Sequence, residues 1–266
     1  ALHSCAMHLS LDQMIDWRFY INGSILAFLF ILLAVFLPSA KKYHNITYLS
    51  WMIAWVVLMY LSSHLFLSVM VLTPHPLVDS RLAAWDKMLG INIPQIVVWA
   101  RSMPSFFKIL VLAYGYLLFI VLIALFFLCV QNDVDHGRRV IMAVILCQFI
   151  AFAIFYFYPA IGPILGYNSI KGFAMTQFDY MQDIMNARTM QQIPVDIVQP
   201  FSNPAFHGLF VVILPYAFIK NRRYFLVASF MALWVLAASI CSGWHYFVDI
   251  VFAIIIASVV VVVVER

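Results

Sequence analysis

Long apolar runs with almost no charge constrain this chain more than any other feature. The last run extends from Tyr246 to Val264 and contains a single carboxylate, Asp249. A helix needs about 20 apolar residues to cross the hydrocarbon core of a bilayer. We therefore expect an all-α, polytopic membrane helix bundle with six to seven transmembrane helices, because backbone polar groups in lipid must be satisfied within helices. The candidate spans are Tyr20–Leu37, Thr47–Leu72, Phe106–Val130, Arg139–Tyr158, Phe206–Ile219, Tyr224–Ile240 and Tyr246–Val264.

The composition agrees with membrane insertion. Of the 266 residues, 65% are hydrophobic and 10% are charged, whereas a soluble domain is about half apolar and about a quarter charged. We expect residues 1–266 to form a single integral membrane domain, with residues 1–17 as an interfacial segment. The scattered net charge of +4 does not indicate a nucleic-acid partner. The four cysteines lack the spacing of a metal or redox site, and we expect neither a metal nor a cofactor.

Lysine and arginine concentrate in three short loops between the candidate spans, which predicts the orientation of the chain. Basic residues in short loops stay on the cytoplasmic side. We therefore place these loops and the C-terminus in the cytoplasm, and the long loops 73–105 and 159–205 in the periplasm or lumen. The expected location is the bacterial inner membrane. The basic residues concerned are Lys41, Lys42, Arg138, Arg139, Lys220, Arg222 and Arg223.

The sequence HYFVD places two ionisable residues at the start of the last candidate span. His245 and Asp249 are four residues apart, so a helix turns both side chains to one face. A carboxylate that holds one ring nitrogen makes the other nitrogen a better nucleophile or base. The alternative is a chance occurrence, since the spacing alone is a weak signal. An ionisable pair within a spanning helix is costly and usually functional, which favours the first interpretation.

The sequence FSNPAFHGLF supplies a second histidine at the head of the fifth candidate span. Pro204 suits a first helical turn and Asn203 could cap it, so His207 projects from that turn. The chain crosses the membrane twice between His207 and His245. Both histidines therefore lie at one membrane surface, at helix N-termini that favour an anion such as phosphate. The alternative is an interfacial histidine hydrogen-bonded to water.

The order of these two motifs resembles that of the type 2 phosphatidic acid phosphatase superfamily. That family carries P-S-G-H before S-R-x5-H-x3-D, and here Pro-x-x-His at His207 precedes His-x-x-x-Asp at His245. The sequence HYFVD is most similar to the branch of inositol phosphorylceramide synthases, sphingomyelin synthases and bacterial relatives. Two further stretches, Val78–Pro94 and Phe157–Pro163, also resemble that branch. The resemblance covers roughly residues 75–260.

The resemblance implies a fold and a mechanism. It implies a six-helix catalytic core within residues 75–260. His245 would attack phosphorus and form a phosphohistidine, and Asp249 would orient and activate it. His207 would protonate the leaving oxygen and then activate the acceptor.

The chain departs from the family pattern in three places. The first family motif, K-x6-R-P, is absent, the S-R pair of the third motif falls at Ala238 and Ser239, and Ala205 replaces the motif serine. Positive charge for a phosphate must then come from other residues of the outer loops. We favour Arg188, which precedes the His207 segment, followed by Lys171 and Arg81. The alternative is that these are ordinary interfacial cations paired with nearby aspartates.

These features together predict a membrane enzyme that cleaves a lipid phosphate ester at the extracytoplasmic face. Water as acceptor would make it a phosphatase, whereas a lipid or polyol hydroxyl would make it a phospholipid headgroup transferase like inositol phosphorylceramide synthase. A catalytically weakened lipid-binding or transport protein is the alternative of another class, suggested by Ala205. The expected partners are the membrane and a lipid phosphate or phospholipid substrate. The residues leave the oligomeric state open.

Overall fold

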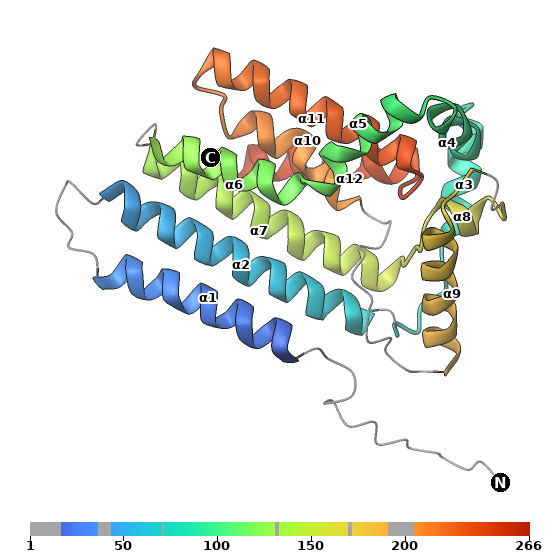
Figure 1. The fold of residues 1–266 in the computed structure, drawn as a ribbon, viewed down its shortest axis with the longest axis horizontal. Helices are drawn as coiled ribbons and strands as arrows, with labels where there is room; N and C mark the ends of the chain where they lie inside the picture. The colour runs from blue at the N-terminus through green and yellow to red at the C-terminus, as the bar shows by residue number, and fades with distance from the viewer. Residues whose placement is uncertain (1–16, 37–43, 71, 131–132, 170–171, 191–204) are drawn as a thin grey trace, which may run out of the picture.

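The part of the chain that the structure describes is entirely helical. The structure, a computed structural model, describes residues 17–36, 44–70, 72–130, 133–169, 172–190 and 205–266 (Figure 1). Helices joined by turns and short connections account for these residues, and none of them forms a strand. The predicted all-α class is therefore confirmed. Residues 1–16 of the predicted interfacial segment lie outside the described residues.

Each of the seven predicted spans coincides with helical structure. The helices lie roughly parallel in a bundle, with α1 and α2 along one side (Figure 1). The helices that correspond to the predicted spans are α1 (Trp17–Phe36), α2 (His44–Met70), α5 (Pro104–Gly115), α6 (Leu117–Val130), α7 (Val134–Phe157), α10 (Phe206–Tyr216), α11 (Arg222–Ser242) and α12 (Phe247–Val264). Four short helices gather at one end of the bundle (Figure 1): α3 (Asp79–Met88), α4 (Ile93–Arg101), α8 (Pro163–Gly166) and α9 (Met175–Met190).

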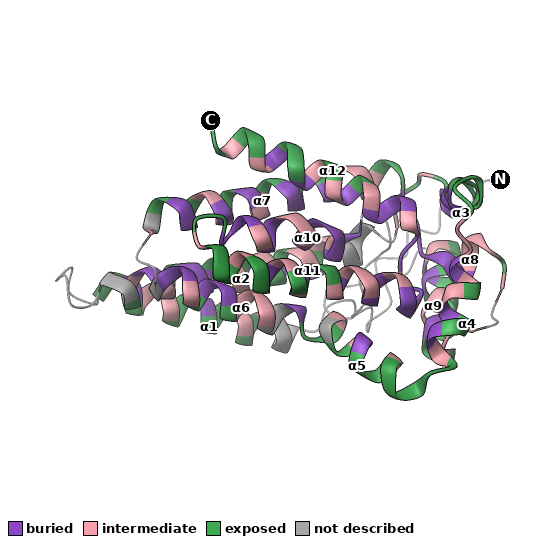
Figure 2. Ribbon diagram, turned by 90° about the horizontal axis from the view of Figure 1, so that it is seen from above, coloured by how far each residue is buried: buried purple, intermediate pink, exposed green. Residues whose placement is uncertain are grey.

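The helices indicate an integral membrane protein. Four of them, α2, α7, α11 and α12, are long and apolar enough to cross a bilayer, and the bent pair of α4 and α5 makes a possible fifth span. Parts of α1, α6 and α10 are shorter apolar helices. Only 28–39% of the residues in the four long spans are buried within the molecule, and the others are partly or fully exposed, as Figure 2 shows. Lipid is the environment that suits such a surface.

The predicted third span, Phe106–Val130, differs from the structure in its continuity. The break within this span follows Gly115, and α6 begins at Leu117. A bend of 113° between α4 and α5 lies just before the span, where Pro104 begins α5 without a backbone N–H to donate. Glycine is a poor helix former, which explains why the run does not continue as one helix.

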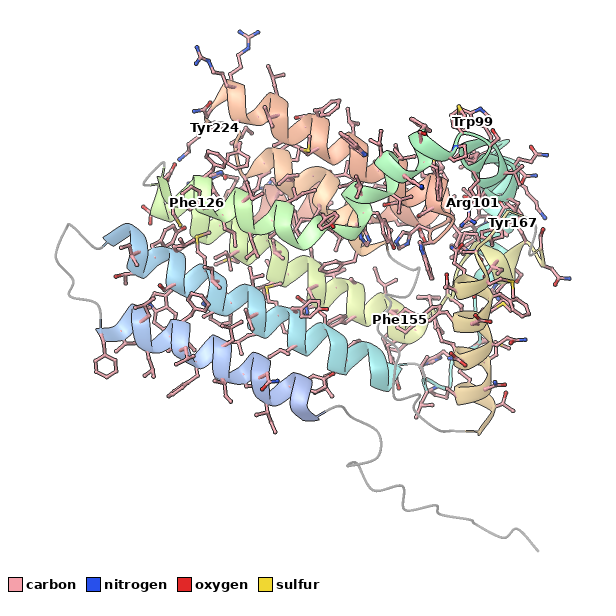
Figure 3. The ribbon with its side chains drawn as sticks, in the orientation of Figure 1. Trp99, Arg101, Phe126, Phe155, Tyr167 and Tyr224 are labelled. Carbon is pink, nitrogen blue, oxygen red and sulfur yellow. The ribbon has the colours of Figure 1, made fainter. Side chains whose placement is uncertain are left out.

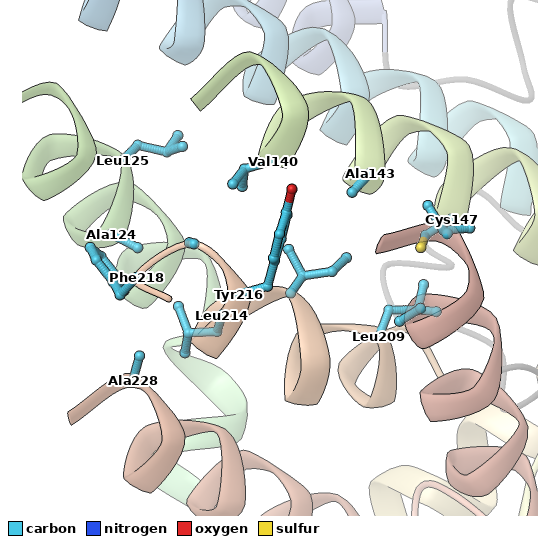
Figure 4. Packing of buried hydrophobic residues seen from close by; sticks show 14 of the residues in the cluster. Ala124, Leu125, Val140, Ala143, Cys147, Leu209, Leu214, Tyr216, Phe218 and Ala228 are labelled. Carbon is cyan, nitrogen blue, oxygen red and sulfur yellow. The ribbon is translucent and has the colours of Figure 1, made fainter. Parts of the chain in front are cut away.

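Small residues let α10 approach α12 closely. A Cβ atom added to Gly208 would lie 2.8 Å from the Cβ atom of Ala253 and 3.3 Å from the carbonyl oxygen of Ile250. Small residues at helix contacts in membranes allow this close packing. The surrounding core is shown in Figure 4, where Leu209 packs beside α7 and α12. Because Gly208 directly follows His207, the contact also sets how near His207 comes to the start of α12.

The bundle end opposite the short helices joins two of the predicted cytoplasmic loops to the C-terminus. The Tyr216 hydroxyl donates a hydrogen bond to Glu265, and the Arg139 guanidinium lies 3.5 Å from the same carboxylate. Lys220 pairs with Asp133 in the loop before α7. Tyr224, at the start of α11, also lies at this end (Figure 3). These contacts bring together elements that the basic residues predicted to share one side of the membrane.

Candidate active site

The loop before α12 turns because α11 ends at a glycine. Gly243 has a φ of 79°, the left-handed conformation that commonly terminates a helix. A Cβ atom at this position would lie 2.7 Å from the Phe173 ring and 2.9 Å from a methyl group of Val97. Glycine therefore satisfies both the backbone and the packing here. The turn directs the chain through Trp244 to His245 and into α12.

Asp249 lies in the first turn of α12 and His245 in the bend just before that helix, so the predicted placement of both on one helical face is wrong, although the two side chains still meet. Both side chains are fully buried. The Nδ1 atom of His245 is 3.7 Å from the Oδ2 atom of Asp249. This separation is that of a close charge contact, longer than a hydrogen bond. The same Oδ2 atom accepts a hydrogen bond from the backbone N–H of Tyr246 at 3.3 Å. Asp249 therefore caps its own helix while it faces the imidazole.

His207 lies across from this pair, at the start of α10. The ring centroids of His207 and His245 are 5.6 Å apart. The side chain of His207 is 7% exposed, and its Nδ1 atom has no hydrogen-bond partner. The two histidines thus share one small, buried region, with one ring nitrogen of His207 left for another group.

Tyr114, at the C-terminal end of α5, completes this group of side chains. Its ring stacks on the His207 ring with centroids 3.8 Å apart and an angle of 11° between the planes. Its hydroxyl lies 3.3 Å from the Nε2 atom of His245. Tyr114 is thus in contact with both histidines at once.

Asp86 of α3 holds the first turn of α12. Its carboxylate accepts hydrogen bonds from the backbone N–H groups of Phe247 at 3.1 Å and Val248 at 2.9 Å. The first N–H groups of a helix have no partner within the helix, and a carboxylate there is favoured by the helix dipole. Asp86 therefore fixes the end of α12 that carries Asp249 and follows His245.

Asp79, the first residue of α3 and about two helix turns before Asp86, ties two other segments together. It accepts hydrogen bonds from the backbone N–H groups of Ile161 at 3.0 Å and Gly162 at 2.8 Å, and from the Tyr246 hydroxyl at 2.9 Å. The Tyr246 hydroxyl is also 2.7 Å from the carbonyl oxygen of Gly162. Three stretches that are far apart in the chain, around Asp79, Gly162 and Tyr246, thus meet at a single point in space.

The sequence of this chain can be compared with those of known protein families, independently of the geometry of the site. Residues 80–263 match the PAP2 superfamily, and this range contains His207, His245 and Asp249. The chain belongs to the PAP2 superfamily. The comparisons with curated proteins and with solved structures give no match. The predicted membership of the type 2 phosphatidic acid phosphatase superfamily is confirmed at this level, and members are generally phosphatases.

The three predicted cations of this PAP2 chain have different places in the structure. Arg188, near the end of α9, is half-buried and donates a hydrogen bond of 2.7 Å to the carbonyl oxygen of His75. Burial lowers the pKa of its guanidinium, and the charge of Asp79 opposes that shift. Arg81 is exposed on α3, and Lys171 lies outside the described residues.

The departures from the PAP2 motifs lie on buried helix positions. Ala205 is the N-cap of α10, is fully buried and provides no side-chain cap. Ala238 and Ser239 are buried in α11, where the Ser239 hydroxyl donates to the carbonyl oxygen of Val235. The positions of the motif serine and arginine therefore supply no charge to the histidines. Pro204 and the predicted cap Asn203 lie outside the described residues.

The sequence did not reveal that Tyr114 contacts both histidines. It also did not reveal that Asp79 and Asp86 bind the start of α12 and the residue before it. In the sequence, the stretch Val78–Pro94 stands out only by its resemblance to a family branch. No local sequence pattern marks Asp79 and Asp86 as supports of the helix start, because the residues that they bind there are at least 161 positions later in the chain. Tyr114 is one of 13 tyrosines and lies in an apolar run, so only its spatial neighbours distinguish it.

The two carboxylates of α3 predict a dependence of stability on pH. Burial raises the pKa of Asp79 from 3.8 to about 6 although it accepts three hydrogen bonds, and burial likewise raises the pKa of Asp86 to about 6. The folded state then binds protons more tightly than the unfolded state. The stabilisation is complete below about pH 4 and is lost as the pH rises through about 6, with a change of roughly 3 kcal/mol per carboxyl.

We therefore expect Tm to fall as the pH is raised from about 4.5 to 7, and we expect Asp79→Asn to reduce this slope. Thermal unfolding of both proteins in detergent micelles at several pH values measures how Tm depends on pH. Asp135→Asn is the matched control, because this carboxylate is 85% exposed and pairs only with Arg138 among its described contacts. Equal slopes in the wild type and the Asp79→Asn variant would contradict the prediction.

Proposed function

We propose that this PAP2 protein is a membrane lipid phosphatase or phosphotransferase that works through a phosphohistidine on His245. The observation that carries the proposal is the meeting of the two buried histidines, with ring centroids 5.6 Å apart, beside the Asp249 carboxylate. Phosphoryl transfer needs a nucleophile, an acid–base group and stabilisation of the charged oxygens. The first two of these needs are met by side chains in this region.

The proposed reaction has two halves. The Nε2 atom of His245 attacks phosphorus, and Asp249 stabilises the positive charge that develops on the ring. His207 donates a proton to the leaving oxygen. It then removes a proton from the incoming hydroxyl as the hydroxyl oxygen bonds to phosphorus. The bond between phosphorus and Nε2 breaks in the same step, which restores the free enzyme.

The proposed substrate is a phosphate ester or phosphodiester whose apolar tail remains in the bilayer. The histidines lie at the end of the spanning helices where α3, α4, α8 and α9 gather, which is the level that a lipid headgroup would occupy. We assign this end to the extracytoplasmic face because the basic loops lie at the other end. Arg188 remains the first candidate for binding the phosphate charge, followed by Lys171 and Arg81.

The acceptor separates a phosphatase from a headgroup transferase. The sequence HYFVD, which is similar to that of inositol phosphorylceramide synthases, favours transfer to an alcohol as the second candidate function. Water and a lipid hydroxyl require the same first half-reaction. The residues around His245 therefore serve both activities.

The test is incubation of the purified protein in vesicles with phosphatidic acid, and separately with a polyprenyl pyrophosphate. Release of inorganic phosphate supports the phosphatase. Exchange of headgroups between lipids without free phosphate supports the transferase. Saturable binding of phosphatidic acid without either reaction would reject catalysis and support the lipid-binding alternative.

A further inference from the structure

The position of Tyr114 between the two histidines is not explained by packing alone. Its ring covers the face of His207 at 3.8 Å, which fixes the direction of its hydroxyl. The hydroxyl then reaches the Nε2 atom of His245, the nitrogen on the side of the ring away from Asp249. In the proposed reaction this is the nitrogen that attacks phosphorus.

The contacts of His245 define which nitrogen is ready to react. A neutral imidazole carries one N–H group and one lone pair. The Asp249 carboxylate lies 3.7 Å from Nδ1 and favours the N–H group on that side. The Tyr114 hydroxyl, 3.3 Å from Nε2, is then the donor and Nε2 the acceptor. Tyr114 and Asp249 thus select together the tautomer whose lone pair lies on Nε2.

We propose that Tyr114 is a further catalytic residue, whose hydroxyl donates a hydrogen bond to a non-bridging oxygen of the phosphoryl group during transfer. This inference rests on the proposed function. When phosphorus bonds to Nε2, the oxygens on phosphorus must enter the space where the hydroxyl now lies. The hydroxyl can leave Nε2 and turn to one of those oxygens, because its ring remains held against His207.

Because this chain departs from the PAP2 motifs, the hydrogen bond from Tyr114 would replace donors that the motif residues would otherwise provide. Neither Ala205 nor Ser239 supplies the donor that the motif serine and arginine would provide, as Ser239 already donates to a backbone carbonyl. A donor aimed at the oxygens of the transition state lowers the barrier most when it is held in place beforehand. Tyr114 is held by its stacking on one histidine and its contact with the other.

The proposed step conserves atoms and protons. The bond between Nε2 and phosphorus forms as the bond between phosphorus and the leaving oxygen breaks. The leaving oxygen takes its proton from His207, and Tyr114 keeps its own proton throughout. Tyr114 therefore stabilises charge without acting as an acid or a base.

The test is Tyr114→Phe, which keeps the ring on His207 and removes only the hydroxyl. We expect kcat to fall on the order of 100-fold, KM to change less than about threefold, and inhibition by orthovanadate to weaken in parallel with kcat. The pH values at which activity is half-maximal should not move, because Tyr114 does not transfer a proton. Tyr224→Phe is the matched control, since Tyr224 lies at the opposite end of the bundle against Phe127 and Phe218 (Figure 3).

The outcomes separate the role of Tyr114 from the proposed function. An active wild type with an equally active Tyr114→Phe variant would overturn the role of Tyr114 and leave the phosphohistidine mechanism in place. A variant more active than the wild type would also overturn it and would make the hydroxyl an inhibitor of His245. If the wild type formed no phosphohistidine with any substrate tested, the proposed function would fail, and the role of Tyr114 would fail with it.

Discussion

Replacement of His245 by glutamine is expected to lower phosphoryl transfer by about 10⁴-fold or more, because the variant lacks the nitrogen that bonds to phosphorus. Glutamine is similar in length to histidine, so the fully buried position is not left as a large cavity. The measurement is the rate of phosphate release or headgroup exchange with the best substrate. Radiolabelled phosphate should also no longer remain on the protein after rapid quenching in base, where phosphohistidine is stable.

The control for this variant is His75→Gln. His75 lies in the turn between α2 and α3, and its ring contacts Tyr156 and Phe157, away from the two proposed catalytic histidines. It should keep both the activity and the labelled intermediate. Substantial activity in His245→Gln would remove His245 as the nucleophile.

Replacement of His207 by glutamine is expected to slow turnover of a lipid phosphate by about 10²- to 10⁴-fold, the usual contribution of an acid–base group. The loss should be smaller for the first step with p-nitrophenyl phosphate, because its leaving oxygen needs no proton. Hydrolysis of the intermediate should still be slow, since the variant cannot activate water. Rapid mixing should therefore show a burst of p-nitrophenol and an accumulated phosphohistidine.

The burst distinguishes this role from a structural one. A variant that merely loosens the α10–α12 contact would slow both substrates alike and would show no accumulated intermediate. Equal slowing of both substrates without an accumulated phosphohistidine would therefore contradict the assignment of His207 as acid and base. Thermal unfolding of the variant provides a separate measure of how much stability the substitution costs.

The site combines a reactive pair with an external support. Asp249 belongs to the first turn of α12 and His245 to the bend before it, whereas Asp86 on α3 accepts hydrogen bonds from the first two N–H groups of that helix. Asp79 connects the same helix start, through Tyr246, to the loop at Gly162. Positions of reacting groups must be held within a fraction of an ångström for efficient transfer. These two carboxylates give the helix start such a support.

Much of the architecture follows from local sequence patterns. The apolar runs marked every long helix, because the thickness of a bilayer sets the length that an apolar helix needs. The sequence placed His245 and Asp249 on one helical face, but α12 begins at Phe247, so the bend before the helix brings His245 to Asp249. The approach of His207 was expected from two predicted membrane crossings. The superfamily was also recognisable from these two motifs and was confirmed over residues 80–263.

The surroundings of the histidines depended on packing between distant parts of the chain. Asp86 and Phe247 are 161 positions apart, and Tyr114 and His245 are 131 positions apart. No local period or spacing relates such residues, since their distance is set by how α3, α5 and α12 pack. Arg188 shows the converse: its place in the sequence suggested the phosphate, whereas its described hydrogen bond is to the carbonyl oxygen of His75. Helix length and motif order are local properties of a chain in a bilayer, but the hydrogen bonds that hold and orient a reactive group exist only once the helices have packed.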